Sequence, residues 1–287
     1  MKQAVDWQQD EVAPLEAEDF ERIRQLAHGT FGLDLKPGKE ELVSARLRRL
    51  VRNGGFHSFR EYHRHVLADR TGMALATMID ALATNHTAFL REPDHFAFLR
   101  EQALPNLAER DSMDIWSAAC STGEEVWTLA MFLNEAFPGR RFFITATDIS
   151  NKALRFAQAA DYPPERCQGI PATWLSRYFV PGTGPAKSYR VAPAIRAQAA
   201  FRRLNLVQPF SWPRPFPVVF CRNVMIYFDR STQEHLIERL AASLEPGGYL
   251  FIGHAESLTR VSHSLEYVRP AVYRKPGKRE GRWTRSS

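Results

Sequence analysis

A polar cluster directly follows a strongly apolar run in the second half of the chain. Residues 217–221 read Pro-Val-Val-Phe-Cys, Arg222 and Asn223 come next, and Tyr227 lies four residues further on. In open α/β sheets, ligands bind beyond the carboxyl ends of the strands. We therefore expect a buried strand that delivers these side chains to a ligand cleft. The alternative is a plain strand end with a solvated arginine.

A second candidate site is the turn over 118–125, which reads Ala-Ala-Cys-Ser-Thr-Gly-Glu-Glu and opens a predicted helix. It has the position of a nucleotide-binding loop, but its single glycine does not match the dinucleotide fingerprint. Glu124 and Glu125 at the start of the helix would repel a phosphate group and would suit a positively charged one. We therefore expect a ligand with a cationic end.

The next strand, over 142–146, is followed by Thr147 and Asp148. In this architecture, an acidic side chain at that point can accept hydrogen bonds from both ribose hydroxyls. The alternative is that Asp148 caps a helix that starts near Asn151.

A nucleoside with a positive, non-phosphate end describes S-adenosylmethionine. The turn over 244–250, Leu-Glu-Pro-Gly-Gly-Tyr-Leu, is common in methyltransferases and favours one over a dehydrogenase.

The elements that must position these residues alternate as in a parallel sheet. Strands are expected over 113–120, 142–146 and 249–253, helices over 95–108, 122–137 and 232–244, a turn over 245–248, and an antiparallel edge hairpin over 265–273. Between the two halves, residues 162–203 are rich in proline and glycine. Short strands at 178–180 and 189–191, joined by a turn at 182–185, predict an inserted β subdomain.

The N-terminal part, 19–84, has helical periodicity and no convincing strand, which predicts a small all-helical domain. Its second helix, over 40–52, places Arg46, Arg49 and Arg52 at successive three-residue steps on one stripe. From the residues alone, we expect such a ridge to be a solvated face.

Composition limits the class of protein. The chain has 287 residues, of which 44% are hydrophobic and 24% charged, and we expect two domains in a cytoplasmic protein without membrane insertion. The three cysteines are scattered and suggest neither a disulfide framework nor a zinc site. Segment 274–287 holds six basic residues and one acidic residue, which is +5 of the net charge of +6. The near-neutral remainder argues against a nucleic-acid partner.

Four separated segments, 84–93, 116–125, 220–229 and 253–258, resemble in order and spacing the signature segments of the CheR family. Members of this family are chemotaxis-receptor glutamate O-methyltransferases. The likeness runs from about residue 19 to 273. It implies an α/β fold: a Rossmann-like S-adenosylmethionine-dependent methyltransferase sheet with an N-terminal all-helical domain and an inserted small antiparallel β subdomain.

The resemblance also implies boundaries and site residues. The expected parts are a flexible N-terminus at 1–18, a receptor-recognition domain at 19–84, a methyltransferase domain at 85–273 with its insertion at 162–203, and a basic flexible tail at 274–287. The helix with Arg46, Arg49 and Arg52 is implied to face the receptor. The family's cofactor contacts fall on Asn85, Thr87, Arg91, Glu124, Asp148, Asn205, Leu206, Arg222 and Asn223.

The implied reaction yields glutamate methyl esters and S-adenosylhomocysteine. A glutamate of ordinary pKa is already ionised near neutrality, so we expect no general base and no metal. Arg91 and Tyr227 are the candidates for positioning the reacting carboxylate; Arg91 could instead hold the carboxylate of the cofactor. The expected partner is the cytoplasmic domain of chemotaxis receptors, which would recruit the enzyme to membrane receptor arrays.

The sequence departs from the family pattern at Val126, Trp127 and Ala255. We expect the bulky Trp127 to reshape one wall of the site. The loop at 182–185 resembles that of members that also dock on a receptor's C-terminal peptide, but it lacks a usual glycine, so peptide docking stays open. Two competing readings remain, a nucleic-acid methyltransferase and a non-catalytic receptor adaptor that senses the cofactor.

Overall fold

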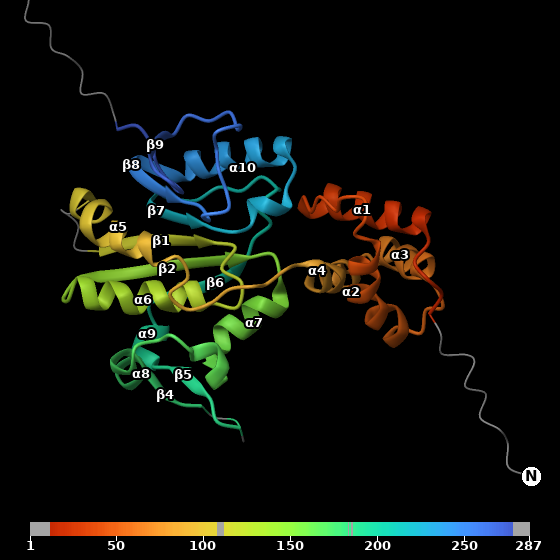
Figure 1. Cartoon of the computed structure of the whole chain (residues 1–287), viewed down its shortest axis with the longest axis horizontal. Coiled ribbons are helices and arrows are strands. Elements are labelled where there is room, and N and C mark those ends of the chain that lie inside the picture. The colour runs from red at the N-terminus through yellow and green to blue at the C-terminus, as the bar shows by residue number, and fades with distance from the viewer. Residues whose placement is uncertain (1–11, 108–111, 183, 185, 278–287) are drawn as a thin grey trace, which may run out of the picture.

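A computed structural model of the chain describes residues 12–107, 112–182, 184 and 186–277. A helical domain, a large sheet flanked by helices and a small separate sheet are its three parts (Figure 1). The first eleven residues of the predicted N-terminal segment, residues 183 and 185 of the predicted turn, and 278–287 of the predicted basic tail lie outside the described residues. In the part of the chain described, no helix is both long and apolar enough to cross a membrane.

The N-terminal domain is all-helical, as the periodicity predicts. Its helices are α1 (Ala17–Phe31), α2 (Glu40–Asn53), α3 (Phe59–Ala68) and α4 (Met73–Leu82). Helix α2 contributes Val43, Leu47 and Val51 to the core, and all three are fully buried. Their spacing of four residues places them on one stripe of the helix, so the opposite face is left to solvent.

A seven-stranded sheet with the order β6-β2-β1-β7-β8-β10-β9 forms the second part. Five strands are parallel, and β9 and β10 form the antiparallel edge hairpin that the sequence predicts. The strands are β1 (Ser112–Ala118), β2 (Arg141–Asp148), β6 (Ala199–Arg203), β7 (Phe216–Cys221), β8 (Leu244–Phe251), β9 (Glu266–Arg269) and β10 (Val272–Arg274).

Helices cover both faces of this sheet (Figure 1). Helices α6 (Glu124–Ala136) and α7 (Asn151–Ala159) share one core with Ile115 and Phe220, and α10 (Arg230–Ser243) shares the other with Trp116 and Val219. The predicted helix at 95–108 is instead a chain of short pieces: α5 (Pro93–Phe98), a π-helical turn over Leu99–Ala103, and a 3₁₀ turn, Pro105–Leu107. The proline at position 105 lacks the N–H that a continuing helix needs.

The chain leaves β1 toward β2 and β6 on one side and reaches β7 and β8 on the other. The strand order therefore reverses between β1 and β7. Every residue of β7 is buried, as expected for a central parallel strand with both faces covered. A crevice beyond the carboxyl ends of β1 and β7 is the usual ligand position in such a sheet.

The predicted turn at 245–248 is part of strand β8. Phe216 pairs with Leu244 and Val218 with Tyr249, so residues 245–248 bulge from the ladder with β7. The bulge is held from the other side, where Gly247 N donates to the carbonyl of Lys275 and Lys275 N donates to the carbonyl of Gly248. These tertiary bonds hold the proline-glycine segment to the chain that follows β10, with Gly247 at a φ of 81°.

The third part is an antiparallel sheet with the order β3-β5-β4, made by Asp161–Tyr162, Tyr189–Val191 and Phe179–Pro181. It carries the short helices α8 (Ala172–Tyr178) and α9 (Pro193–Arg196) and a 3₁₀ turn, Pro164–Cys167. Strand β6 lies within the predicted insertion 162–203, but it pairs in parallel with β2 in the main sheet. Its apolar contacts with α6 and α7 draw it there.

The helical domain is fastened to the main sheet by the chain that follows α1. Asn205 Nδ2 donates to the carbonyl of Thr30, and Asp34 N donates to the carbonyl of Tyr227, both at 2.8 Å. Gly32 lies at the joint with a φ of 74°, and an added Cβ would meet Val207 Cγ1 at 2.6 Å. Glycine is therefore required there both for backbone conformation and for close packing.

Candidate functional site

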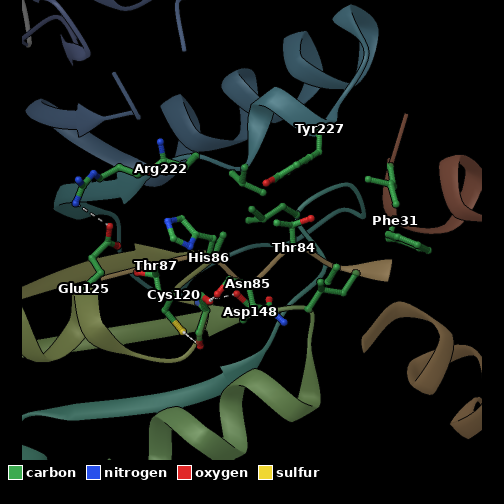
Figure 2. Close-up of a pocket in the computed structure, with 18 of the residues that line it drawn as sticks. Phe31, Thr84, Asn85, His86, Thr87, Cys120, Glu125, Asp148, Arg222 and Tyr227 are labelled. Atoms are coloured by element: carbon green, nitrogen blue, oxygen red, sulfur yellow. Dashed lines mark hydrogen bonds and ion pairs between the residues drawn. The ribbon is translucent and has the colours of Figure 1, made fainter. Parts of the chain in front are cut away.

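A cleft lies at the predicted position, between the strand ends and the helical domain (Figure 2). Clefts at this position of an open α/β sheet are the usual small-molecule sites. Side chains from the helical domain, the linker after α4, and the loops after β1, β2, β6 and β7 line it. They include Phe31, Leu33, Thr84, Asn85, His86, Thr87, Arg91, Ala119, Cys120, Ser121, Glu125, Asp148, Ile149, Leu204, Asn205, Leu206, Arg222, Asn223, Tyr227 and Phe228.

Backbone strain concentrates around this cleft. Among the described residues, seven other than glycine have a positive φ, and five of them lie in the segments that border it: Leu90, Glu92, Ala119, Ser121 and Asn223. Such conformations persist only where the surrounding structure fixes them, and they cluster at functional sites. The loops are therefore held in defined shapes.

Asp148 lies at the end of β2 and is almost fully buried. Its two oxygens accept hydrogen bonds from Ser121 N at 2.8 Å and Ser150 N at 2.9 Å. It does not cap α7, because the side chain of Ser150 takes that role by accepting from Ala153 N. Each carboxylate oxygen has a further lone pair, so Asp148 can still accept from a ligand.

The two glutamates at the start of α6 point in different directions. Glu125 lines the cleft and is bonded to Ser117 Oγ at 2.7 Å. Glu124 does not line it: its carboxylate accepts from Thr122 Oγ1 at 2.7 Å and from Arg166 Nη1 at 2.8 Å. Neighbouring residues at a helix start diverge by about 100°, so only one of the pair can face the ligand.

Arg222 is the centre of a buried ion-pair network. Its guanidinium is bonded to Glu92 Oε2 at 2.9 Å, to Glu125 Oε2 at 3.1 Å and to the carbonyl of Arg91 at 2.6 Å. Only 2% of the side chain is exposed. The predicted strand end with a polar side chain is present, but these partners turn the guanidinium toward Glu125 (Figure 2).

Burial raises the pKa of Glu92, yet the charge and hydrogen bonds of Arg222 outweigh it, so that the pKa of Glu92 is lowered. Burial also raises the pKa of Glu125, and there it prevails over Arg222. The network therefore holds two carboxylates against one guanidinium.

Asn223 follows with a φ of 57° and lines the cleft. Its Nδ2 donates to Glu92 Oε1 at 3.2 Å. Gly253 lies against it, and a Cβ at this glycine would come within 2.3 Å of Asn223 Nδ2. Gly253, the first residue of the fourth signature segment, thus makes room for the amide.

Asn205 and Leu206, which the resemblance implies as cofactor contacts, line the cleft. Phe31 and Leu33 of the helical domain line the same cleft, although no sequence pattern pointed to them. Phe31 ends α1 and Leu33 follows it, and their position depends on the contacts at Gly32 and Asn205. Trp127 does not reach the cleft: its ring packs against Phe201 with centroids 5.4 Å apart.

The linker after α4 contributes Asn85, Thr87 and Arg91. Arg91 Nη1 donates to the carbonyl of His86 at 2.9 Å, which fixes one side of the guanidinium. The ring of His86 and the hydroxyl of Tyr227 point into the cavity (Figure 2). His86 lies between two predicted residues and is a further lining residue that the sequence analysis missed.

Arg46, Arg49 and Arg52 lie on α2, outside the cleft. Arg46 donates to the carbonyl of Leu82 at 2.5 Å and to Thr84 Oγ1 at 3.0 Å, and it thereby ties α2 to the linker. Arg49 and Arg52 are exposed. Only the latter two are thus available to a partner without breaking a contact.

The cleft fits the predicted S-adenosylmethionine. Phe31, Leu33 and Leu206 provide apolar surface for a base, and Asp148 offers acceptors for ribose hydroxyls. Burial raises the pKa values of both Asp148 and Glu125, and a cationic ligand group would favour their charged forms. These residues would hold a nucleoside that carries a sulfonium and an ammonium group.

Glu92, His95 and His254 place ligand atoms within 4.8 Å of one another. The carboxylate of Glu92 is already bonded to Arg222, Asn223 and the backbone N–H of His254. A cation there would lie beside the guanidinium of Arg222 and be repelled by it. We therefore assign this cluster no metal-binding role.

His95 gives the protein an acid-sensitive group. It is 2% exposed, and burial, followed by the charge of Arg222, lowers its pKa to about 3. The folded state therefore binds a proton at His95 more weakly than the unfolded state does. As pH falls below the ordinary histidine pKa of about 6.5, protonation favours the unfolded state and the free energy of unfolding decreases. We expect wild type to lose about 2 kcal/mol more than His95→Phe between pH 6.5 and 5 in urea unfolding.

The exposed His235→Gln variant is the control for this measurement and should keep the wild-type pH dependence. An unchanged slope in His95→Phe would show that His95 is not the responsible group.

Two family models match the chain. One, described as the all-alpha domain of CheR methyltransferase, matches residues 18–83, and the other, described as its SAM-binding domain, matches residues 85–273. Together they cover the helical domain and the sheet with its insertion.

Curated relatives match over most of their length. Chemotaxis protein methyltransferase 2 of Pseudomonas aeruginosa is 40% identical over 260 residues, which is 89% of this chain and 92% of the relative. The chemotaxis protein methyltransferase of Borreliella burgdorferi is 35% identical, covering 90% and 94%. Among solved structures, the glycopeptide N-methyltransferase MtfA with bound S-adenosylmethionine is 17% identical at a TM-score of 0.33, covering 62% of this chain and 58% of that one. At that score the likeness adds nothing to the assignment.

Proposed function

This chain belongs to the CheR methyltransferase family, and from that membership we propose that it methylates glutamate side chains of chemotaxis receptors. The cofactor is S-adenosylmethionine. The observation that carries the proposal is the cleft, in which Asp148, Glu125, Arg91 and Tyr227 come together at the ends of the parallel strands. This arrangement supplies acceptors for a cationic nucleoside and donors for a carboxylate.

When bound, S-adenosylmethionine supplies an electrophilic methyl carbon, which a receptor carboxylate takes up as a methyl ester, leaving S-adenosylhomocysteine. The carboxylate is ionised near neutrality and needs no proton removed. The work of the protein is therefore placement, and alignment of reacting groups can supply a large part of a rate enhancement.

We assign roles from position in the cleft. Asp148 would hold the ribose hydroxyls, Asn205 and Leu206 the base, and Glu125 the cationic end, with Asn85, Thr87 and Asn223 completing the contacts. Arg222 would act indirectly, by holding Glu125 and Glu92 in place. Glu124 would also act indirectly, by fixing the loop after β1. Arg91 has one side of its guanidinium fixed by His86, so it can present the other to a carboxylate. Tyr227 would give one directed hydrogen bond to the substrate.

Methyl transfer is the direct test. Purified protein, S-adenosylmethionine with a labelled methyl group and receptor cytoplasmic domain should yield labelled receptor, and mild base should release the label as methanol. Label that is stable to base, or label on nucleic acid, would contradict a glutamate ester. If the protein binds S-adenosylmethionine but transfers no methyl group to the receptor, the result would favour a non-catalytic receptor adaptor that senses the cofactor.

Receptor recognition is proposed to use the exposed guanidinium groups of α2. We expect the double variant Arg49→Glu/Arg52→Glu to raise KM for receptor at least 10-fold, because it replaces attraction for an acidic surface with repulsion. Its affinity for S-adenosylhomocysteine should match wild type, since neither residue lines the cleft. Arg46 is left intact because it holds the linker.

The matched control is Arg64→Glu/Arg70→Glu, which makes the same charge change at exposed positions in and after α3. If the two double variants raise KM for the receptor equally, the effect at α2 reflects overall charge and not a specific contact of α2 with the receptor.

Docking of a receptor's C-terminal peptide is a finer proposal for the small sheet. Strand β4 is one of the two edges of this sheet, and it exposes Val180. An extended peptide could add to that edge through backbone hydrogen bonds. Titration of labelled receptor peptide onto wild type and Val180→Asp would test it, with loss of binding expected in the variant.

A further inference from the structure

Glu256 is a buried carboxylate that none of the roles above uses. It lies in the fourth signature segment, after β8, and only 9% of it is exposed. Its Oε2 accepts from Gly253 N at 2.6 Å and Asn223 N at 3.0 Å. Its Oε1 accepts from Met225 N at 2.7 Å and Ile226 N at 3.4 Å.

These four donors belong to two different segments. Gly253 follows β8, and the other three form the loop after β7, which includes the 3₁₀ turn Met225–Tyr227. A single side chain thus joins the ends of the two adjacent parallel strands β7 and β8. It accepts hydrogen bonds from backbone N–H groups that lie beyond the strand pairing. Ionised carboxylates form stronger hydrogen bonds to backbone N–H than neutral acceptors do.

The loop that Glu256 holds carries Asn223 and Tyr227, both in the cleft. The other side of the same loop is held by the helical domain, where Asp34 N donates to the carbonyl of Tyr227 at 2.8 Å. Gln233 of α10 also holds the turn, because its Nε2 donates to the carbonyls of Met225 and Phe228 at 2.9 and 3.1 Å. Among these anchors, Glu256 is the one that binds the backbone N–H groups of the loop from the end of β8.

We propose that Glu256 is a positioning residue for methyl transfer, which acts by fixing the loop that presents Tyr227; this inference rests on the proposed function. The side chain is hydrogen-bonded to the backbone of the loop and does not line the cleft. Its effect should therefore appear in kcat and not in affinity for the cofactor product.

The variant Glu256→Gln tests the two carboxylate oxygens separately, because it replaces one of them with an NH₂ group. The amide oxygen should stay with Gly253 and Asn223, whose bonds are shorter on average, and the NH₂ group then faces the N–H donors of Met225 and Ile226. The 3₁₀ turn loses the anchor on its N–H groups, and we expect kcat to fall about 100-fold, as for a displacement of about 1 Å. Affinity for S-adenosylhomocysteine should change less than about threefold by the same reasoning.

A double-mutant cycle with Tyr227→Phe distinguishes positioning from general support of the fold. If Glu256 acts through the phenol, adding Glu256→Gln to Tyr227→Phe should lower kcat by less than about threefold. A full additional 100-fold loss would overturn the proposal. The exposed Glu238→Gln on α10 is the charge-matched control and should keep wild-type kcat.

Hydrogen exchange in the wild-type protein tests the anchor independently of catalysis and of variant folding. The amides of Gly253, Asn223 and Met225 should exchange slowly, and rapid exchange would overturn the proposal even in an active enzyme. If wild type transfers no methyl group although these amides are protected, the proposed function fails while the anchor remains.

Discussion

Asp148→Asn should bind S-adenosylhomocysteine about 100-fold more weakly than wild type, a loss of about 2.7 kcal/mol. The carboxylate at the end of β2 can accept from two ribose hydroxyls at once while it accepts from Ser121 N and Ser150 N. An amide keeps one acceptor oxygen and turns a donor toward groups that are themselves donors. Isothermal titration calorimetry measures the affinity directly.

Because Asp148 also holds the loop after β1, the variant could weaken binding without any ribose contact. An analogue that lacks both ribose hydroxyls separates the two causes: wild type and Asp148→Asn should bind it with similar affinity. A variant that loses affinity for both ligands equally would contradict the ribose assignment. Asp114→Asn is the matched control, since Asp114 lies on β1 and does not line the cleft.

Much of this architecture could be predicted from the sequence because the signals are local. The apolar run at 217–221 predicts the buried strand β7, and the change from strand to helix at 118–125 predicts the crossing from β1 to α6. Asp148 is predictable for the same reason: the end of a parallel strand fixes where the next side chain points.

The predictions from sequence are wrong or incomplete where contacts between residues far apart in the chain determine the direction of a side chain. Glu124 and Glu125 are adjacent and chemically alike, and Arg166, from a separate part of the chain, draws one of them away from the cleft. Arg222 has the predicted location, but Glu92 and Glu125 take up its guanidinium. Phe31 and Leu33 line the cleft only because Gly32 docks on the sheet. None of these contacts has a signature in the local sequence.

Arg222→Met should destabilise the protein by about 3–5 kcal/mol, because it leaves Glu92 and Glu125 buried without their counter-charge. The cost should be largest near pH 8 and shrink toward pH 5. Without the guanidinium the pKa of Glu92 is no longer lowered and the pKa of Glu125 rises further. The folded variant therefore takes up protons that wild type does not, and its relative stability falls as pH rises. Urea unfolding at the two pH values measures this difference.

Two further variants identify the cause. Arg222→Met/Glu125→Gln should recover part of the lost stability, because one of the stranded charges is gone. Arg230→Met breaks the ion pair with Glu234 on the surface, where 72% of the arginine side chain is exposed, and should cost less than about 1 kcal/mol. If Arg222→Met instead keeps wild-type stability and loses only affinity for S-adenosylhomocysteine, the guanidinium contacts the ligand directly, and its bonds to the two glutamates are secondary.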